Sequence, residues 1–198
     1  MLGFGAIGEA PLGGLPNRVI EQIRSGGNVA TLTISSLIVP VRQDTEGVLV
    51  RSYGALWLEM ARQLGTDWTK AFDLSPRQWE EMLAGAFDKE GYKVTLTPSS
   101  GDRGRDIIAV RDGIGSMRIL GSMKRYAPDN LVTRAHVHEM FGVVNSDLGA
   151  TKGIIATTSD FAPQLLSDPG LAKAIPYRIQ LMNGSQLQDW LKELVKTP

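Results

Sequence analysis

Apolar positions near the middle of the chain predict two neighbouring strands. Residues 106–111 and 117–125 are both rich in Ile, Val and Leu, and the segment between them, Asp112-Gly-Ile-Gly-Ser116, carries strong turn signals. The two segments are therefore expected to form an antiparallel hairpin. Folding the hairpin about its glycines places Asp106 opposite roughly residues 122–124 of the neighbouring strand.

This hairpin brings an acidic, a hydroxyl and a basic side chain together. Because strand side chains alternate, Ser122 and Lys124 share one face, where Asp106 can join them. Hydrolysis of a phosphodiester needs a hard cation bound by oxygen atoms, an activated water and positive charge near the developing phosphorane. Asp106 is suited to bind Mg²⁺, with the backbone carbonyl of Met123 as a further ligand, and Lys124 is suited to orient the water. The alternative is an ordinary exposed Asp–Lys pair across a hairpin.

A pattern with helical spacing precedes the hairpin. Ser75-Pro-Arg-Gln78 has the form of a capping box with proline at the first helical position. On the helical wheel Glu80 lies at the border of the apolar face and is expected to point toward the sheet, whereas Glu81 is expected to point outward. A solvated charge is the alternative for Glu80. The apolar residues that predict this amphipathic helix, ending near Gly91, are Trp79, Met82, Leu83, Ala86 and Phe87.

Several short motifs follow one another in a specific order over roughly residues 73–198. These runs are Trp79-Glu80, Gly91-Tyr92, Ser99-Ser-Gly-Asp-Arg-Gly-Arg-Asp106-Ile-Ile-Ala, Met123-Lys124-Arg-Tyr126, Val137-His-Glu139-Met-Phe-Gly142, Lys152-Gly-Ile-Ile-Ala-Thr-Thr-Ser-Asp-Phe161 and Leu181-Met-Asn-Gly184. In order and spacing the set resembles the catalytic domain of Mrr-like restriction endonucleases.

The resemblance implies the PD-(D/E)xK nuclease fold, a mixed central sheet flanked by helices, and Mg²⁺-dependent cleavage of double-stranded DNA, with Mn²⁺ as a substitute metal. It makes Glu80 the helix carboxylate and a further metal ligand, Asp106 the central metal ligand and Lys124 the catalytic lysine. Two residues before the lysine the family usually has glutamine, and the broader superfamily glutamate or aspartate. This chain has Ser122 there, whose neutral hydroxyl supplies no second carboxylate. An alternative function is therefore a DNA-binding or assembly module that keeps the fold and has weakened or lost catalysis.

The charge balance limits how the chain can attract DNA. Lys plus Arg and Asp plus Glu number 21 each, so the formal net charge is zero and attraction needs a local basic patch. Arg103, Arg105 and Arg125 are predicted to contact DNA, and Arg118 and Arg134 are expected to extend the patch. An ordinary solvated face is the alternative reading of this cluster.

The first 70 residues predict a small β-rich accessory module, an N-terminal extension to a nuclease domain of residues 71–198. Residues 28–41 predict one or two strands, residues 47–50 can pair with them across a turn at residues 44–47, and residues 55–64 predict a helix. The module is expected either to contact DNA, to mediate oligomerisation, or only to pack. A homodimer or a higher oligomer is compatible with the sequence.

Composition is consistent with a cytoplasmic nuclease. With 198 residues, 42% of them hydrophobic, the chain can bury a substantial core. It contains no cysteine, which excludes disulfides and thiolate metal sites and is compatible with a reducing compartment. The sequence has no apolar run of about 18 residues and no basic start of a secretory signal, so we expect a soluble protein.

Overall fold

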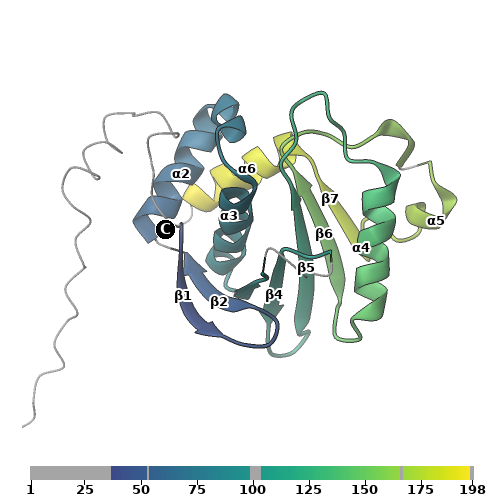
Figure 1. Ribbon diagram of the computed structural model, residues 1–198, viewed down its shortest axis with the longest axis horizontal. Coiled ribbons are helices and arrows are strands. Elements are labelled where there is room, and N and C mark those ends of the chain that lie inside the picture. Colours follow the sequence, from purple (N-terminus) through teal and green to yellow (C-terminus); the bar gives the residue numbers. More distant parts are fainter. Residues whose placement is uncertain (1–36, 53, 99–103, 166, 197–198) are drawn as a thin grey trace, which may run out of the picture. The chain divides into compact units, whose positions relative to one another are not determined.

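The computed structural model of the chain describes residues 37–52, 54–98, 104–165 and 167–196 (Figure 1). These described residues belong to one compact unit. The predicted strand segment before residue 37 and the loop arginine Arg103 lie outside the described residues. Among the helices that are described, none is long and apolar enough to cross a membrane.

A single mixed sheet organises the described part of the unit, with its strands in chain order from β1 to β7. Neighbouring strands from β1 to β5 are antiparallel, whereas β5, β6 and β7 run parallel to one another. This is the mixed central sheet that the sequence predicts. The strands are β1 (Ile38–Gln43), β2 (Val48–Ser52), β3 (Lys93–Leu96), β4 (Ile107–Arg111), β5 (Met117–Lys124), β6 (Lys152–Thr157) and β7 (Ile179–Met182).

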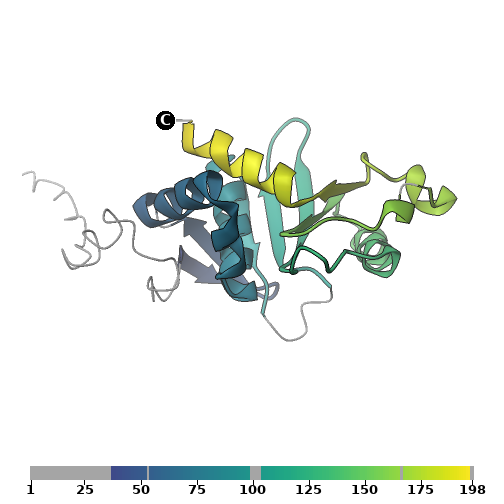
Figure 2. The ribbon, with the colours of Figure 1, turned by 90° about the horizontal axis from the view of Figure 1, so that it is seen from above.

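Helices cover both faces of the sheet (Figures 1 and 2). A Cβ added to Gly121 of β5 would lie 3.7 Å from Leu83 Cδ2, so this face of β5 lies under α3. The next residue back, Leu120, points the other way and shares a core cluster with Met140 of α4. The helices are α2 (Gly54–Thr66), α3 (Pro76–Lys89), α4 (Arg134–Ser146), α5 (Pro169–Ala172) and α6 (Gly184–Lys196), with 3-10 turns η2 (Trp68–Phe72) and η3 (Pro163–Leu165).

Helix α3 begins and ends where local signals predict. Ser75 and Gln78 form the capping box around Pro76, and Gly91 adopts a positive φ of 83° just past the end of the helix. All five predicted apolar positions are buried. The prediction for Glu81 is wrong, because this residue is only 7% exposed and its Oε2 accepts a 2.8 Å hydrogen bond from the backbone N–H of Leu37.

The reason for the error is that α3 is covered on more than one side. Trp57 of α2 is fully buried and its Nε1–H donates to the carbonyl of Met82 at 3.0 Å. A Cβ on Gly85 would lie 2.2 Å from Trp57 Nε1, so this close approach requires glycine. A helical wheel for α3 assumes that only the sheet covers the helix. In the structure α2 and the start of β1 cover further sides of it, so Glu81 is buried.

The predicted hairpin of the N-terminal extension forms, with β1 and β2 antiparallel around the turn at residues 44–47. The predicted helix is present as α2. Strand β2 continues the sheet by pairing with β3, and α2 packs against α6. Residues 38–66 therefore share one sheet and one core with the residues that follow, while a role of residues 1–70 in DNA contact or oligomerisation stays a prediction.

Candidate active site

Asp106 stands at the point where β4 begins. Ile107 pairs with Gly121 of β5, and the backbone N–H of Asp106 donates to the Gly121 carbonyl at 2.8 Å. The regular register with β5 ends at Ile107, because the Asp106 N–H bonds the carbonyl of Gly121, the residue that already pairs with Ile107. Asp106 Oδ2 accepts a hydrogen bond from the backbone N–H of Met123. The carboxylate is thus held against the edge of β5 just before β4 begins.

Ser122 and Lys124 lie on the same face of β5, because the strand is regular and two residues separate them. Ser122 is only 3% exposed, and its Oγ has no hydrogen-bond partner among the described residues. Lys124 is partly buried, and its carbonyl accepts bonds from Thr157 Oγ1 at 2.8 Å and from the Thr158 N–H at 3.2 Å. Strand β6 therefore fixes the backbone that carries the lysine.

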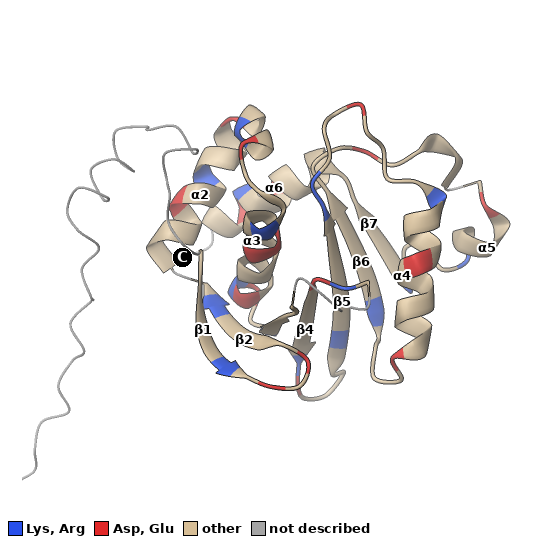
Figure 3. Cartoon of the chain, viewed as in Figure 1, with Lys and Arg blue, Asp and Glu red and all other residues tan. Residues whose placement is uncertain are grey.

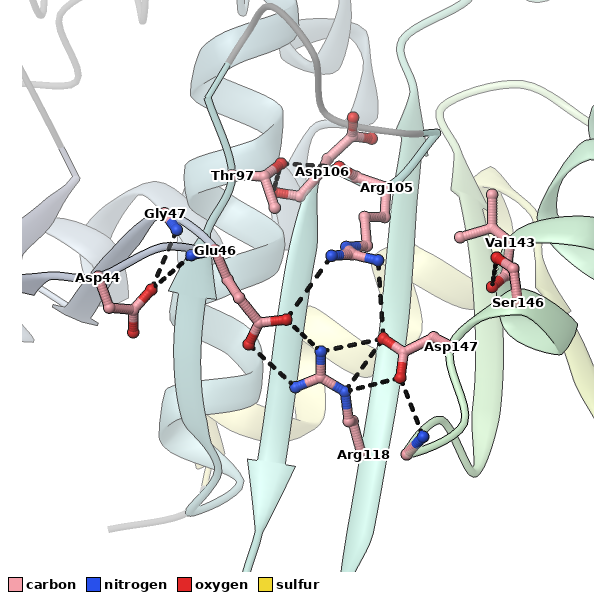
Figure 4. Close-up of polar contacts among 11 residues, drawn as sticks. Asp44, Glu46, Gly47, Thr97, Arg105, Asp106, Arg118, Val143, Ser146 and Asp147 are labelled. Carbon is pink, nitrogen blue, oxygen red and sulfur yellow. Dashed lines mark hydrogen bonds and ion pairs between the residues drawn. The ribbon is translucent and has the colours of Figure 1, made fainter.

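Thr97, just after β3, holds the segment that carries Asp106 (Figure 4). Its backbone N–H donates to the Asp106 carbonyl at 2.9 Å, and its hydroxyl lies 2.7 Å from the Arg105 carbonyl and 2.9 Å from the Asp106 carbonyl. No motif in the sequence predicts a role for Thr97. The only sequence feature that could have pointed to this role is a hydroxyl side chain at the end of an apolar strand.

Glu80 extends from α3 toward the same end of β3. Its Oε2 accepts a 2.8 Å bond from Arg77, and the same Arg77 nitrogen lies 3.3 Å from the Thr97 carbonyl. The Glu80 side chain is 19% exposed. Arg77 and Thr97 thus link the helix carboxylate to the backbone of Asp106.

The oxygen atoms at this point suit a hard cation that keeps most of its water. The N–H and C=O groups of one strand residue point to the same side, so the Met123 carbonyl faces the side on which its N–H meets Asp106. The unpartnered Ser122 Oγ adds a buried polar atom without a structural use. Within the described residues no three His, Asp or Glu side chains gather to form a richer site. Mg²⁺ fits such a donor set, because it binds through one or two carboxylates and retains waters.

Two arginines of the predicted basic patch form ion pairs with carboxylates of this chain. Arg105 is 13% exposed and lies 3.6 Å from both Glu46 and Asp147, and Arg118 pairs with the same two carboxylates. Two positive and two negative charges cancel in this cluster. Sequence spacing could not reveal it, because Glu46 and Asp147 are far from both arginines along the chain.

The other two described arginines of the predicted basic patch, Arg125 and Arg134, have different surroundings. Arg125 is exposed, next to Lys124, and its guanidinium donates to the Phe72 carbonyl. Arg134 pairs with Asp168 at 3.3 Å. Figure 3 shows that basic and acidic residues are interspersed over the described elements. Arg125 is therefore the predicted DNA contact that the structure leaves at the surface beside the site.

Ion pairing favours the charged forms of Asp147 and Arg118. Burial opposes ionisation of Asp147, but the hydrogen bonds and charge of Arg118, the Gly149 N–H and the charge of Arg105 outweigh it, so the pKa of Asp147 lies below its usual value. Burial likewise opposes the charge on Arg118, but its bonds to Glu46 and Asp147 outweigh that effect and raise the pKa of Arg118.

Comparison with known proteins identifies the family. The family model for the Mrr catalytic domain, described as "Restriction endonuclease", matches residues 72–191. The chain belongs to this restriction endonuclease family, and membership supports a nuclease function. No curated protein matches the sequence significantly.

Three solved structures show similarity to the fold. The MspJI restriction endonuclease in complex with a 27-mer oligonucleotide is 19% identical, with a TM-score of 0.43, and the match covers 74% of this chain and 36% of that one. The DNA modification-dependent restriction endonuclease AspBHI is 16% identical, with a TM-score of 0.48, and the match covers 71% of this chain and 37% of that one. The protein of unknown function AF1548 is 16% identical, with a TM-score of 0.45, and the match covers 56% of this chain and 59% of that one. The chain thus spans little more than a third of the length of the two restriction enzymes.

Proposed function

We propose that this chain is a restriction-type endonuclease that hydrolyses phosphodiester bonds of double-stranded DNA with the help of Mg²⁺, or of Mn²⁺ as a substitute. The observation that carries the proposal is the hydrogen bond from the Met123 N–H to Asp106 Oδ2, which brings this carboxylate to the segment of β5 that also carries Ser122 and Lys124. Membership of the restriction endonuclease family supports the same chemistry.

Each residue has a distinct role in the proposed reaction. Asp106 and the Met123 carbonyl would hold the cation, with Glu80 as the helix carboxylate that completes the site. When bound, Mg²⁺ supplies Lewis acidity toward the phosphate and lowers the pKa of a coordinated water. Lys124 orients the attacking water and places positive charge beside the developing phosphorane. Ser122 Oγ, buried and unpartnered, can hold a water of the site by a hydrogen bond.

DNA contact is proposed for the exposed surface beside Lys124. Arg125 is the described residue best placed to pair with a phosphate, and Arg103 stays a prediction outside the described residues. DNA contact by Arg105 also stays a prediction, with Glu46 and Asp147 each 3.6 Å from its guanidinium.

A second candidate is a DNA-binding or assembly module without full catalysis. The observation in its favour is that a neutral Ser122 stands where a further ligand is usual, so that the described residues bring no cluster of three acidic or histidine ligands together. Metal binding separates the two candidates, since a working site has to bind Mg²⁺ or Mn²⁺ through Asp106.

The test is cleavage of plasmid DNA by purified protein with Mg²⁺ or Mn²⁺, and with EDTA as the control. Asp106→Asn and Lys124→Ala should each abolish cleavage and leave the thermal unfolding midpoint nearly unchanged, because both groups serve the reaction and not the core. Lys93→Met, which breaks an exposed ion pair with Asp112 at the other end of β4, should cleave like wild type. Undiminished cleavage by a purified double variant of Asp106 and Lys124 would refute the assignment of the site.

A further inference from the structure

Four charged side chains from four separate segments meet on the α4 face of the sheet (Figure 4). Arg118 of β5 is central: its Nη2 donates to Glu46 Oε1 at 2.5 Å and to Asp147 Oδ2 at 3.0 Å. Its Nη1 also donates to Glu46 Oε2 at 3.3 Å and its Nε to Asp147 Oδ2 at 3.2 Å. The guanidinium of Arg105 lies 3.6 Å from each of the same carboxylates. We call these four residues the charge cluster.

The Glu46 carboxylate is held by the turn between β1 and β2. Asp44 Oδ1 accepts the backbone N–H groups of Glu46 at 2.9 Å and of Gly47 at 3.1 Å. Gly47 has φ of 151°, and a Cβ there would lie 2.3 Å from the Leu96 carbonyl oxygen, so only glycine lets the turn lie against β3. The position of Glu46 is thus set by its own hairpin and by β3, independently of Arg105.

The end of α4 holds the other carboxylate. The Asp147 N–H donates to the Val143 carbonyl at 3.1 Å, and Asp147 Oδ1 accepts from the Gly149 N–H at 3.0 Å. Helix α4 also lies close to the backbone of Gly104, the residue before Arg105. A Cβ on Gly104 would lie 3.0 Å from Val143 Cγ2, and Gly104 has a φ of 78°. Residues 104 and 105 therefore meet α4 through both backbone and side chain.

The segment that these contacts hold is the one that carries Asp106. Residues 104–106 precede β4; Thr97 and the Gly121 carbonyl hold Asp106 and the Arg105 carbonyl from β3 and β5, and the charge cluster adds a contact through the Arg105 side chain. We propose that Glu46, Arg105 and Asp147 are positioning residues for Asp106: the charge cluster holds the Arg105 backbone so that the Asp106 carboxylate stays against the Met123 N–H. The catalytic consequence rests on the proposed function, whereas the positioning itself can be measured without metal.

This arrangement gives the hairpin of β1 and β2 a role in positioning Arg105. No motif in the first 70 residues indicates such a role. The turn of this hairpin supplies one of the two carboxylates that face Arg105, so the hairpin acts on the active site through one ion pair. Arg118 keeps both carboxylates in place when the Arg105 charge is removed, because it bonds each of them directly. An Arg105 variant should accordingly loosen residues 104–106, which keep their backbone bonds to Thr97 and Gly121, and leave the rest of the charge cluster intact.

The test follows amide hydrogen exchange by NMR in metal-free protein. In Arg105→Met and in Glu46→Gln the Met123 amide should exchange about tenfold faster than in wild type, because its acceptor is held less well. The amide of Leu120, paired on both sides within the sheet, should keep its wild-type rate. Lys93→Met should change neither amide, and Arg105→Lys, which restores the positive charge, should bring Met123 back toward the wild-type rate.

A Met123 rate that stays at the wild-type value in both variants would overturn the inference, as would equal acceleration at Met123 and Leu120, which indicates general loosening of the fold. Titration with Mn²⁺ then tests the consequence for the site: binding should be several-fold weaker in Arg105→Met than in wild type. Wild-type protein that binds no Mn²⁺ would sink the proposed function alone, because the exchange result does not depend on metal.

Discussion

Replacing Ser122 with alanine should make the metal-free protein more stable. Ser122 is 3% exposed and its Oγ has no partner among the described residues, so the folded chain carries the cost of a buried, unpaired hydroxyl. That cost is about 1–3 kcal/mol, and alanine removes it while losing only one small atom from the packing. We expect the free energy of unfolding to rise by about 1 kcal/mol, which shifts the midpoint upward by about 2–4 °C for a chain of this size.

With metal present the same substitution should act in the opposite direction. If the hydroxyl holds a water of the hydrated cation, its loss removes one hydrogen bond of about 1 kcal/mol, or about fivefold in the dissociation constant. At a fixed concentration of Mn²⁺, the ligand-induced gain in stability should therefore be smaller in Ser122→Ala than in wild type. Ser122→Glu, which adds a carboxylate on the correct face, should bind metal more tightly than wild type.

The assay is thermal unfolding in EDTA and in a series of Mn²⁺ concentrations. Thr157→Val provides the matched control, because the Thr157 hydroxyl is also fully buried but donates to the Lys124 carbonyl at 2.8 Å. This control should lose about 1 kcal/mol in EDTA. A Ser122→Ala variant that is less stable than wild type in EDTA would refute the reasoning, since it would show that the hydroxyl already has a partner.

Two further outcomes follow from the charges. Arg125→Ala should weaken DNA binding and reduce the slope of log affinity against log salt by about 1, whereas Lys93→Ala, at the start of β3, should leave the slope unchanged. Equal slopes for Arg125→Ala and wild type would remove this arginine from the interface. Asp147→Asn should unfold more easily than wild type at neutral pH: the folded pKa of Asp147 is depressed, so its stabilisation is complete above the ordinary carboxyl pKa and disappears as pH falls through the folded value. Denaturant unfolding from pH 7 to pH 2 measures the difference, and a gap between the two proteins that persists at pH 2 would contradict the assignment.

Local signals in the sequence were sufficient for the parts of the site that depend on neighbouring residues. The capping box at Ser75 and the positive φ of Gly91 mark the two ends of α3, and the turn between β4 and β5 sets the register that pairs Ile107 with Gly121. These features follow from backbone geometry within a few residues, so a single sequence contains the information for them. The order of the short motifs predicts the protein family, and the family match over residues 72–191 confirms that prediction.

Tertiary structure decided which charges face water and which face one another. Glu81 is buried because the start of β1 covers a side of α3 that a helical wheel leaves open, and Arg105 is neutralised because Glu46 and Asp147 come from segments far along the chain. The unpartnered state of Ser122 Oγ is likewise a property of the packed sheet. A sequence pattern reports the period of one element, whereas burial and ion pairing depend on the elements that pack against it, and only the folded chain brings those together.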